Sequence, residues 1–191
     1  MVVVTDIFLF VSPSQLRAGN SPKTVQARRV SQAPRIDGFL NEEVWNLASP
    51  ISDFTQSDPQ EGAPPSEKTT IRVLYDIDAI YFGCMMEDSE PDKIVHRLAR
   101  RDNEVESDYI SIRIDSFHDH QTGFEFTINA SGTKVDILQY NDAKEENESW
   151  DVVWDVSTQL LNNGWSAEVR IPLQALRFSK QEQQTWGINF I

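Results

Sequence analysis

The stretch RIDSFHDHQTGFEF at residues 113–126 concentrates side chains that carry acid–base and metal chemistry. It holds His118 and His120, two of the three histidines in the chain. Two imidazoles fall short of the three or four protein ligands of a zinc site. Asp119 and Thr122 suit a turn, because their side-chain oxygens can accept backbone N–H bonds. We therefore predict a hairpin connection here, with a metal site as the alternative.

Other reactive patterns are missing from the sequence, which contains no P-loop, nucleophile elbow, H-E-x-x-H, EF-hand loop or Rossmann glycine pattern. A glycosidase needs two carboxylates across a cleft. Glu104, Glu106 and Asp108 form the cluster in which such a pair would be sought. A solvated acidic rim explains the same cluster, so a hydrolase ranks last among the functions considered.

An acidic loop, NDAKEENESWD at 141–151, offers the hard oxygen ligands that calcium prefers. We expect no required cofactor, and we name Asp142, Glu145 and Glu146 as ligands of an optional structural calcium. A solvated loop is the alternative reading.

The elements that must position these groups are short strands. DYISIRID at 108–115 alternates three isoleucines with polar residues, and GFEFTINASG at 123–132 alternates in the same way. Asn162-Asn163-Gly164 is a strong hairpin signal. Short helical turns are expected after Asn41, which would place Trp45 inward, and after Pro172. Seven or more such strands predict an all-β fold, an antiparallel β-sandwich with immunoglobulin-like layering and one or two short helices.

Composition narrows the range of partners. The chain has 191 residues, 39% of them hydrophobic, which is enough for the core of one domain. Its formal charge of −13 repels nucleic acid and anionic membranes but leaves cations and neutral polar ligands open. No run approaches the ~20 apolar residues of a membrane span. Cys84 is the single cysteine, so no intrachain disulfide can form.

The N-terminal run MVVVTDIFLFV is apolar but is broken by Thr5 and Asp6, and it lacks a basic n-region and a cleavage site. We assign residues 1–32 to an arm, an extra strand or a degraded export signal, and residues 33–191 to the sandwich. The sequence stops inside an apolar strand at Ile191. We therefore expect the sandwich to be C-terminally truncated.

Several motifs in a fixed order resemble the family 9 carbohydrate-binding modules, whose fold is also compared with DOMON domains. They are RIDGFLNEEVW, RVLYDIDAIYFG, DYISIRID, HDHQTGFEFTINASG, NDAKEENESWDVVWD, GWSAEVRIPLQALRF and TWGINF. The closest type is the module at the N-terminus of large bacterial envelope proteins that continue into a C-terminal barrel (DUF5916-like). The resemblance implies a non-catalytic β-sandwich that binds plant-type or other polysaccharides, often with structural calcium, in an exported protein.

At single positions the chain departs from the family pattern. Val105 stands where sugar-binding members carry a stacking tryptophan, and Ser111 and Thr127 align with their glutamate and arginine. The second stacking tryptophan would lie beyond Ile191. We expect sugar to contact the polar strand faces, with an aromatic wall at Trp150, which follows the acidic loop. The predicted ligand-binding residues are Ser111, Arg113, Thr127, Asn129, Trp150 and Asp108.

The predicted partner is therefore a carbohydrate, and the predicted location is extracytoplasmic, in the periplasm, at the outer membrane or secreted. An alternative function is an interaction domain that packs on a C-terminal barrel of its parent protein and binds no sugar. An exposed apolar edge at residues 185–191 would favour that alternative.

Overall fold

The structure is a computed structural model that describes residues 6–11, 23–103, 105–141 and 143–191. These residues form short strands and three single turns of 3-10 helix. The strands are β1 (Asp6–Val11), β2 (Lys23–Arg29), β3 (Thr69–Tyr75), β4 (Ala79–Glu87), β5 (Tyr109–Asp115), β6 (Thr122–Asn129), β7 (Lys134–Tyr140), β8 (Glu145–Asn147), β9 (Asp155–Leu161), β10 (Gly164–Pro172) and β11 (Gln183–Phe190). The 3-10 turns are η1 (Glu43–Leu47), η2 (Pro91–Lys93) and η3 (Leu173–Ala175).

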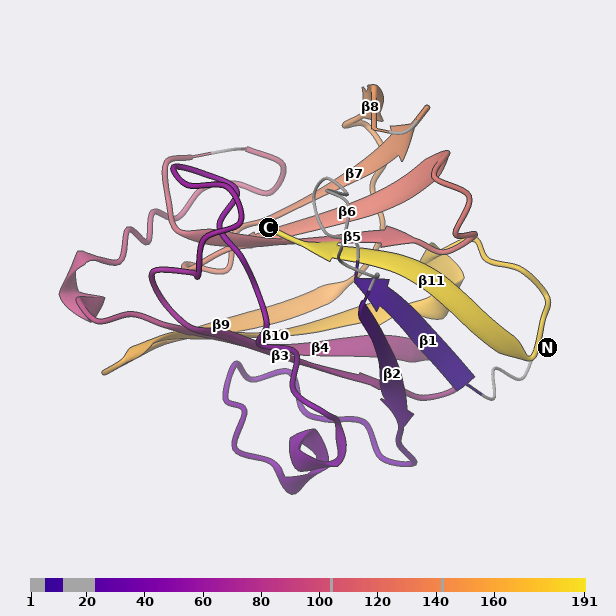
Figure 1. The fold of residues 1–191 in the computed structure, drawn as a ribbon, viewed down its shortest axis with the longest axis horizontal. Coiled ribbons are helices and arrows are strands. Elements are labelled where there is room, and N and C mark those ends of the chain that lie inside the picture. The colour runs from indigo at the N-terminus through magenta and orange to yellow at the C-terminus, as the bar shows by residue number, and fades with distance from the viewer. Residues whose placement is uncertain (1–5, 12–22, 104, 142) are drawn as a thin grey trace.

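The strands form two facing layers, which confirms the predicted β-sandwich (Figure 1). Their order is β8-β7-β6-β5-β11-β1-β2-β3-β4-β10-β9. One layer contains β5, β6, β7 and β11, the other contains β3, β4, β9 and β10, and the β1–β2 pair joins them at one side (Figure 1). Neighbouring strands are antiparallel except for β1 with β11 and β2 with β3, which are parallel.

Alternation along the strands builds the core between the layers. In β5, Ile110, Ile112 and Ile114 are buried and face the buried aromatic residues of β6. The facing layer contributes buried apolar residues from β3, β4 and β10 to the same cluster. Because successive side chains of a strand point to opposite faces, the residues between the isoleucines lie on the outer face of the β5 layer.

The predicted N-terminal arm contributes two strands to the sandwich. β1 lies between β2 and β11, and β2 continues onto β3 through Arg28 and Arg29. Ala27 of β2 is buried in the core. Consequently β11 has a neighbour on each side, β5 and β1, and is not an edge strand of the sheet. This pairing covers part of the apolar edge that the interaction-domain alternative expects at residues 185–191: β1 pairs as far as Ile188 and β5 as far as Phe190, and Ile191 is 48% exposed.

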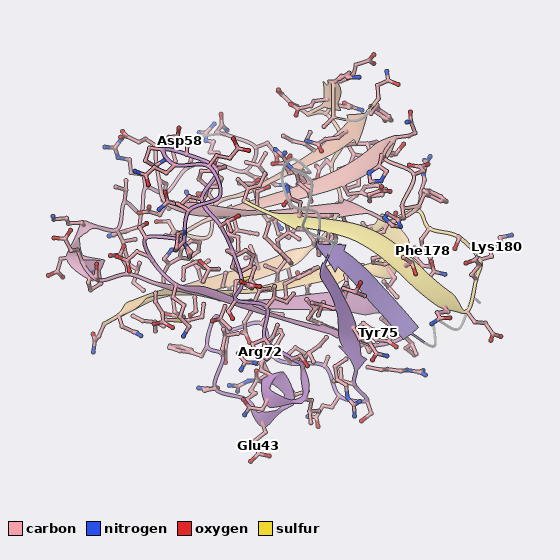
Figure 2. All side chains as sticks on the ribbon, in the orientation of Figure 1. Glu43, Asp58, Arg72, Tyr75, Phe178 and Lys180 are labelled. Carbon is pink, nitrogen blue, oxygen red and sulfur yellow. The ribbon has the colours of Figure 1, made fainter. Side chains whose placement is uncertain are left out.

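The outer face of the layer formed by β3, β4, β9 and β10 is covered by residues 34–48, and we call it the closed face. η1 lies beneath this layer (Figure 1), and Trp45 is buried against it, as predicted. Asn41 is not the helix cap, because η1 begins one residue later than expected, with Glu42 in the cap position and no side-chain cap bond. Figure 2 shows Glu43 of η1 and Asp58 of the 52–68 loop at opposite sides of the molecule.

A buried glutamate of β10 holds this cover in place. The side chain of Glu168 is 0% exposed, and it accepts hydrogen bonds from the backbone N–H groups of Asp37 and Gly38 and from Trp45 Nε1, each at 2.8 Å. Burial raises the pKa of Glu168, although these three bonds act in the opposite direction. The opposing strand residue is Gly83, and the ring of Trp45 packs where its side chain would be.

No helix in the described ranges is long and apolar enough to cross a membrane. Cys84 is buried in the core, where burial raises its pKa to about 12. The thiol therefore stays protonated at neutral pH, in agreement with its predicted role as a small apolar residue.

Candidate functional site

The outer face of the layer formed by β5, β6, β7 and β11, which we call the open face, collects polar side chains across neighbouring strands. The strand register sets Ser111 opposite Thr127 and Arg113 opposite Glu125. Because directly opposed residues on one face of an antiparallel pair have their Cβ atoms roughly 5 Å apart, these four side chains form one cluster.

Glu125 is the centre of this cluster. Its Oε1 accepts hydrogen bonds from Ser111 Oγ at 2.7 Å and Thr127 Oγ1 at 3.3 Å. Its Oε2 accepts from Arg113 Nε at 2.8 Å and from Gln139 Nε2 of β7 at 2.7 Å. All four donors lie on β5, β6 or β7, so the carboxylate orients side chains of its own layer.

Burial makes this arrangement rigid although it lies on an outer face. Ser111 is 1% exposed and Glu125 is 7% exposed, whereas Arg113 is only half-buried. A buried carboxylate without partners would be costly, and here its partners come from three strands. The cluster therefore holds the guanidinium of Arg113 in a fixed orientation on the open face.

A hollow of about 490 Å³ lies over one end of the cluster. Arg113, Glu125 and Thr127 form part of its lining, and Tyr109 and Val105 border it. Tyr109 begins β5 and is 56% exposed, so its ring is accessible to a ligand. Tyr109 and Arg113 also border a neighbouring hollow of about 470 Å³ on the β11 side. An exposed aromatic ring beside oriented polar groups is the arrangement that binds a partly apolar, hydroxylated ligand.

Asp108 and Asn129, two of the predicted ligand-binding residues, hold the loop that walls this hollow. Asp108 Oδ2 accepts the backbone N–H of Val95 at 2.6 Å. Asn129 donates to the carbonyl of Arg97 at 2.8 Å, and its Oδ1 accepts the backbone N–H groups of Ser131 and Thr133. The side chain of Asn129 therefore forms its hydrogen bonds with backbone groups and holds the loop in place, although it also borders the hollow.

Arg101 anchors the same loop from the inner side. Its Nη2 donates to Asp136 Oδ1 at 2.6 Å and to the carbonyl of Val152 at 2.8 Å, and it forms an ion pair with Asp151. Burial lowers the pKa of Arg101, but the bond to Asp136 and the surrounding carboxylates outweigh this, so the net shift is upward. The guanidinium stays charged and ties the loop to β7.

Trp150 does not form the predicted aromatic wall. Its ring packs against Phe124 and Phe126, at centroid distances of 5.3 and 5.9 Å, and it is half-buried against the core. Phe124 and Phe126 point inward from β6, so Trp150 lies on the opposite side of the layer from Arg113. The expectation failed because Trp150 is not part of a strand: β9 begins only at Asp155, so no alternation of side chains turns this ring to the open face.

The histidine stretch forms the predicted turn between β5 and β6. The carboxylate of Asp115 accepts the backbone N–H of His120 at 2.9 Å, and Asp119 accepts that of Gln121 at 2.9 Å. The rings of His118 and His120 lie 5.5 Å apart. Among the described residues, no three His, Cys, Asp or Glu side chains come together as a metal site.

The predicted calcium ligands are only partly described, because Asp142 lies outside the described residues. Glu145 accepts a bond from Asn141 at 2.6 Å, and Glu146 accepts one from Gln139 at 3.3 Å. Both belong to β8, where consecutive side chains point to opposite faces. Glu145 and Glu146 therefore lie on opposite faces of β8, and the calcium site stays a prediction.

Three residues of the site were not predicted from the sequence: Tyr109, Glu125 and Gln139. Alternation already placed Tyr109 on the face of Arg113, and placed Glu125 between two inward phenylalanines. The sequence alone could therefore have placed Tyr109 and Glu125 on the open face. Gln139 could not be placed in this way, because only the register of β6 with β7 brings it to Glu125.

Comparisons with known proteins identify the family and the fold of this chain. Residues 36–191 match the model of the family described as carbohydrate family 9 binding domain-like. A search of curated protein sequences found no match. A family 9 carbohydrate-binding module from Caldicellulosiruptor kristjanssonii, solved with cellotriose, is 18% identical with a TM-score of 0.53, over 76% of this chain and 67% of that one.

Two further solved structures share the fold. The Caldicellulosiruptor kristjanssonii module solved with glucose is 19% identical with a TM-score of 0.53, over 76% of this chain and 69% of that one. A Bacteroides uniformis protein named as carbohydrate-binding is 13% identical with a TM-score of 0.62, over 86% and 80% of the two chains. At these identities the likeness identifies the fold. Since the family model covers residues 36–191, the chain belongs to the carbohydrate family 9 binding domain-like family.

Proposed function

We propose that this chain is a non-catalytic carbohydrate-binding module whose ligand lies on the open face, between Tyr109 and Arg113. The observation that carries the proposal is the buried polar cluster around Glu125, which lies directly beneath a hollow bordered by an exposed aromatic ring. Membership of the family and the fold shared with modules solved in complex with sugars support it.

The chemistry of the open face matches a neutral sugar. The C–H face of a pyranose packs on an aromatic ring such as Tyr109, while its hydroxyls need oriented hydrogen-bond partners. The ion pair with Glu125 uses Nε and Nη2 of Arg113, so Nη1 is the nitrogen that a sugar hydroxyl would contact. A chain with a formal charge of −13 disfavours anionic ligands, so uncharged polysaccharide or oligosaccharide is the ligand class proposed.

The carboxylates at the hollow favour binding without hydrolysis. A glycosidase needs one carboxyl group that donates a proton and a second across the cleft. Glu125 is held as an acceptor by donors from three strands, and Glu106 is exposed and paired with Arg97 at 3.1 Å. We infer that the site recognises its ligand, within an exported protein that handles polysaccharide outside the cytoplasm.

Titration calorimetry with glucose, xylose, cello-oligosaccharides and soluble xylan tests the proposal. We expect saturable heat with at least one of these sugars, and Tyr109→Ala should weaken the affinity at least about tenfold because stacking is lost. Tyr140→Ala is the matched control, because Tyr140 is an exposed tyrosine of β7 outside the hollow. It should leave the affinity unchanged.

A second pair tests the polar half of the site. Arg113→Gln should weaken binding, whereas Arg170→Gln should not, because Arg170 pairs with Asp155 in the other layer. No heat with any sugar from a folded protein would overturn the proposed function. Binding that survives both Tyr109→Ala and Arg113→Gln would overturn the proposed position of the site.

A further inference from the structure

A second, smaller hollow of about 140 Å³ lies on the open face beyond Arg113. Its lining includes Asp115, Gly123, Gly187 and Gln139. The register sets Gly187 opposite Asp115 and Gly123 opposite Gln139, so these residues lie in one row across β11, β5, β6 and β7. Gly123 leaves a gap in that row where another residue would place a side chain, whereas a Cβ atom on Gly187 would lie 3.2 Å from Asp115 and 3.6 Å from the His118 ring.

On the closed face, the strand residue Gly83 makes room for side chains of the covering segment. A Cβ atom on Gly83 would lie 2.7 Å from Leu40 and 2.9 Å from the ring of Trp45, so the chain itself fills that space. The three atoms nearest to a Cβ atom on Gly123 would belong to its sheet neighbours Gln139 and Ile114, the closest being Gln139 Oε1 at 3.4 Å.

The glycine hollow continues the candidate sugar site. Arg113 borders both hollows, and Asn189 of β11, opposite Arg113 in the register, borders the smaller one. Tyr109 and Asp115 lie at the two ends of β5, so the polar face between them runs for about 20 Å at ~3.4 Å per residue. That length exceeds one sugar ring.

Polar groups at the rim of the glycine hollow suit further sugar hydroxyls. The side-chain oxygen Oε1 of Gln139 faces the space above Gly123, and the Nε2 of the same amide donates a hydrogen bond to Glu125. Asp115 and Asn189 supply further polar atoms to the same lining. The floor is glycine backbone, which lets the C–H face of a sugar approach closely.

We propose that the glycine hollow is a second subsite, so that the module binds an oligosaccharide chain lying along β5 and crossing Arg113, and not a single sugar. This inference rests on the proposed function, because it extends the Tyr109 site. The ligand class is a linear, uncharged oligosaccharide with one ring beside Tyr109 and another, further along the chain, over Gly123.

The test compares chain lengths in the wild type and in Gly123→Val. We expect the affinity of the wild type to rise from glucose through cellobiose to cellotetraose, or along the xylose series if that is the series that binds. Valine suits a strand, and its methyl groups would fill the hollow. Gly123→Val should weaken the longest ligand about tenfold and leave the shortest binding ligand within about twofold.

The outcomes separate the two proposals. Retained affinity for the shortest ligand shows that Gly123→Val is folded and that the Tyr109 site is intact. An affinity that does not increase with chain length, or a Gly123→Val variant that binds the longest ligand as tightly as the wild type, would overturn the second subsite alone. An absence of binding to every sugar in the wild type would overturn the proposed function itself. If Gly123→Val unfolds, Gly123→Ala provides the same test with a smaller expected loss.

Discussion

Two buried glutamates lie on the outer faces of the two layers, and their hydrogen-bond donors come from different places. Glu168 on the closed face is bonded by Asp37, Gly38 and Trp45, which belong to the segment that covers it. Glu125 on the open face is bonded by side chains of its own layer. The same chemical group therefore secures a cover on one layer and organises an uncovered polar surface on the other.

The glycines repeat this contrast. Gly83 accommodates the Trp45 ring, whereas Gly123 lines a hollow on the open face. The closed face is buried beneath its covering segment and contains a second, smaller apolar cluster around Trp45. The open face has kept the features of a recognition surface: space, an exposed aromatic ring and oriented polar groups.

The largest expected effect distinguishes the two glutamates by stability. Glu168→Ala leaves two buried N–H groups and one half-buried N–H group without an acceptor, and we expect a loss of at least about 3 kcal/mol in the free energy of unfolding. Glu125→Ala should cost about 1–2 kcal/mol, because its former donors lie at a hollow that water can enter. Urea denaturation measures both variants. Equal losses, or a larger loss for Glu125→Ala, would contradict the assignment of one face as closed and the other as open.

A smaller effect is expected from the two glycines. Gly83→Ala forces a methyl group to within 3 Å of Leu40 and the Trp45 ring, and overpacking of this kind costs about 1–3 kcal/mol. Gly123→Ala should change stability by less than about 0.5 kcal/mol, because its nearest contact is an ordinary 3.4 Å. Thermal unfolding of the two variants decides the matter. A Gly123→Ala variant as destabilised as Gly83→Ala would mean that the hollow is packed.

Much of the fold could be predicted from local patterns. Alternation in β5 and β6 identified which face is buried, and Asn162-Asn163-Gly164 placed the turn between β9 and β10. The burial of Trp45 followed from its position in the helical turn expected after Asn41. An extra strand is one of the readings of residues 1–32, but the partners of β1 and β2 could not be predicted, because parallel pairing with β11 and β3 joins segments far apart in the sequence.

The site was predicted less completely, for a physical reason. Ser111, Arg113 and Thr127 follow from alternation, and the structure brings all three to Glu125. The hub role of Glu125 depends on contacts across three strands, which no single segment encodes. Trp150 was misplaced because the course of residues 150–154 is determined by Arg101, which binds the Val152 carbonyl from a distant loop.

The most direct test of the account is to map ligand contacts by two-dimensional amide NMR while adding the tightest-binding oligosaccharide. The account predicts shifts in the amide signals of β5 and β6, around Tyr109, Arg113 and Gly123, with the signals of Gly83 and Glu168 on the closed face unchanged. Shifts confined to the closed face, or no shifts at saturating concentrations of sugar, would contradict the claim that the open face is the ligand-binding surface.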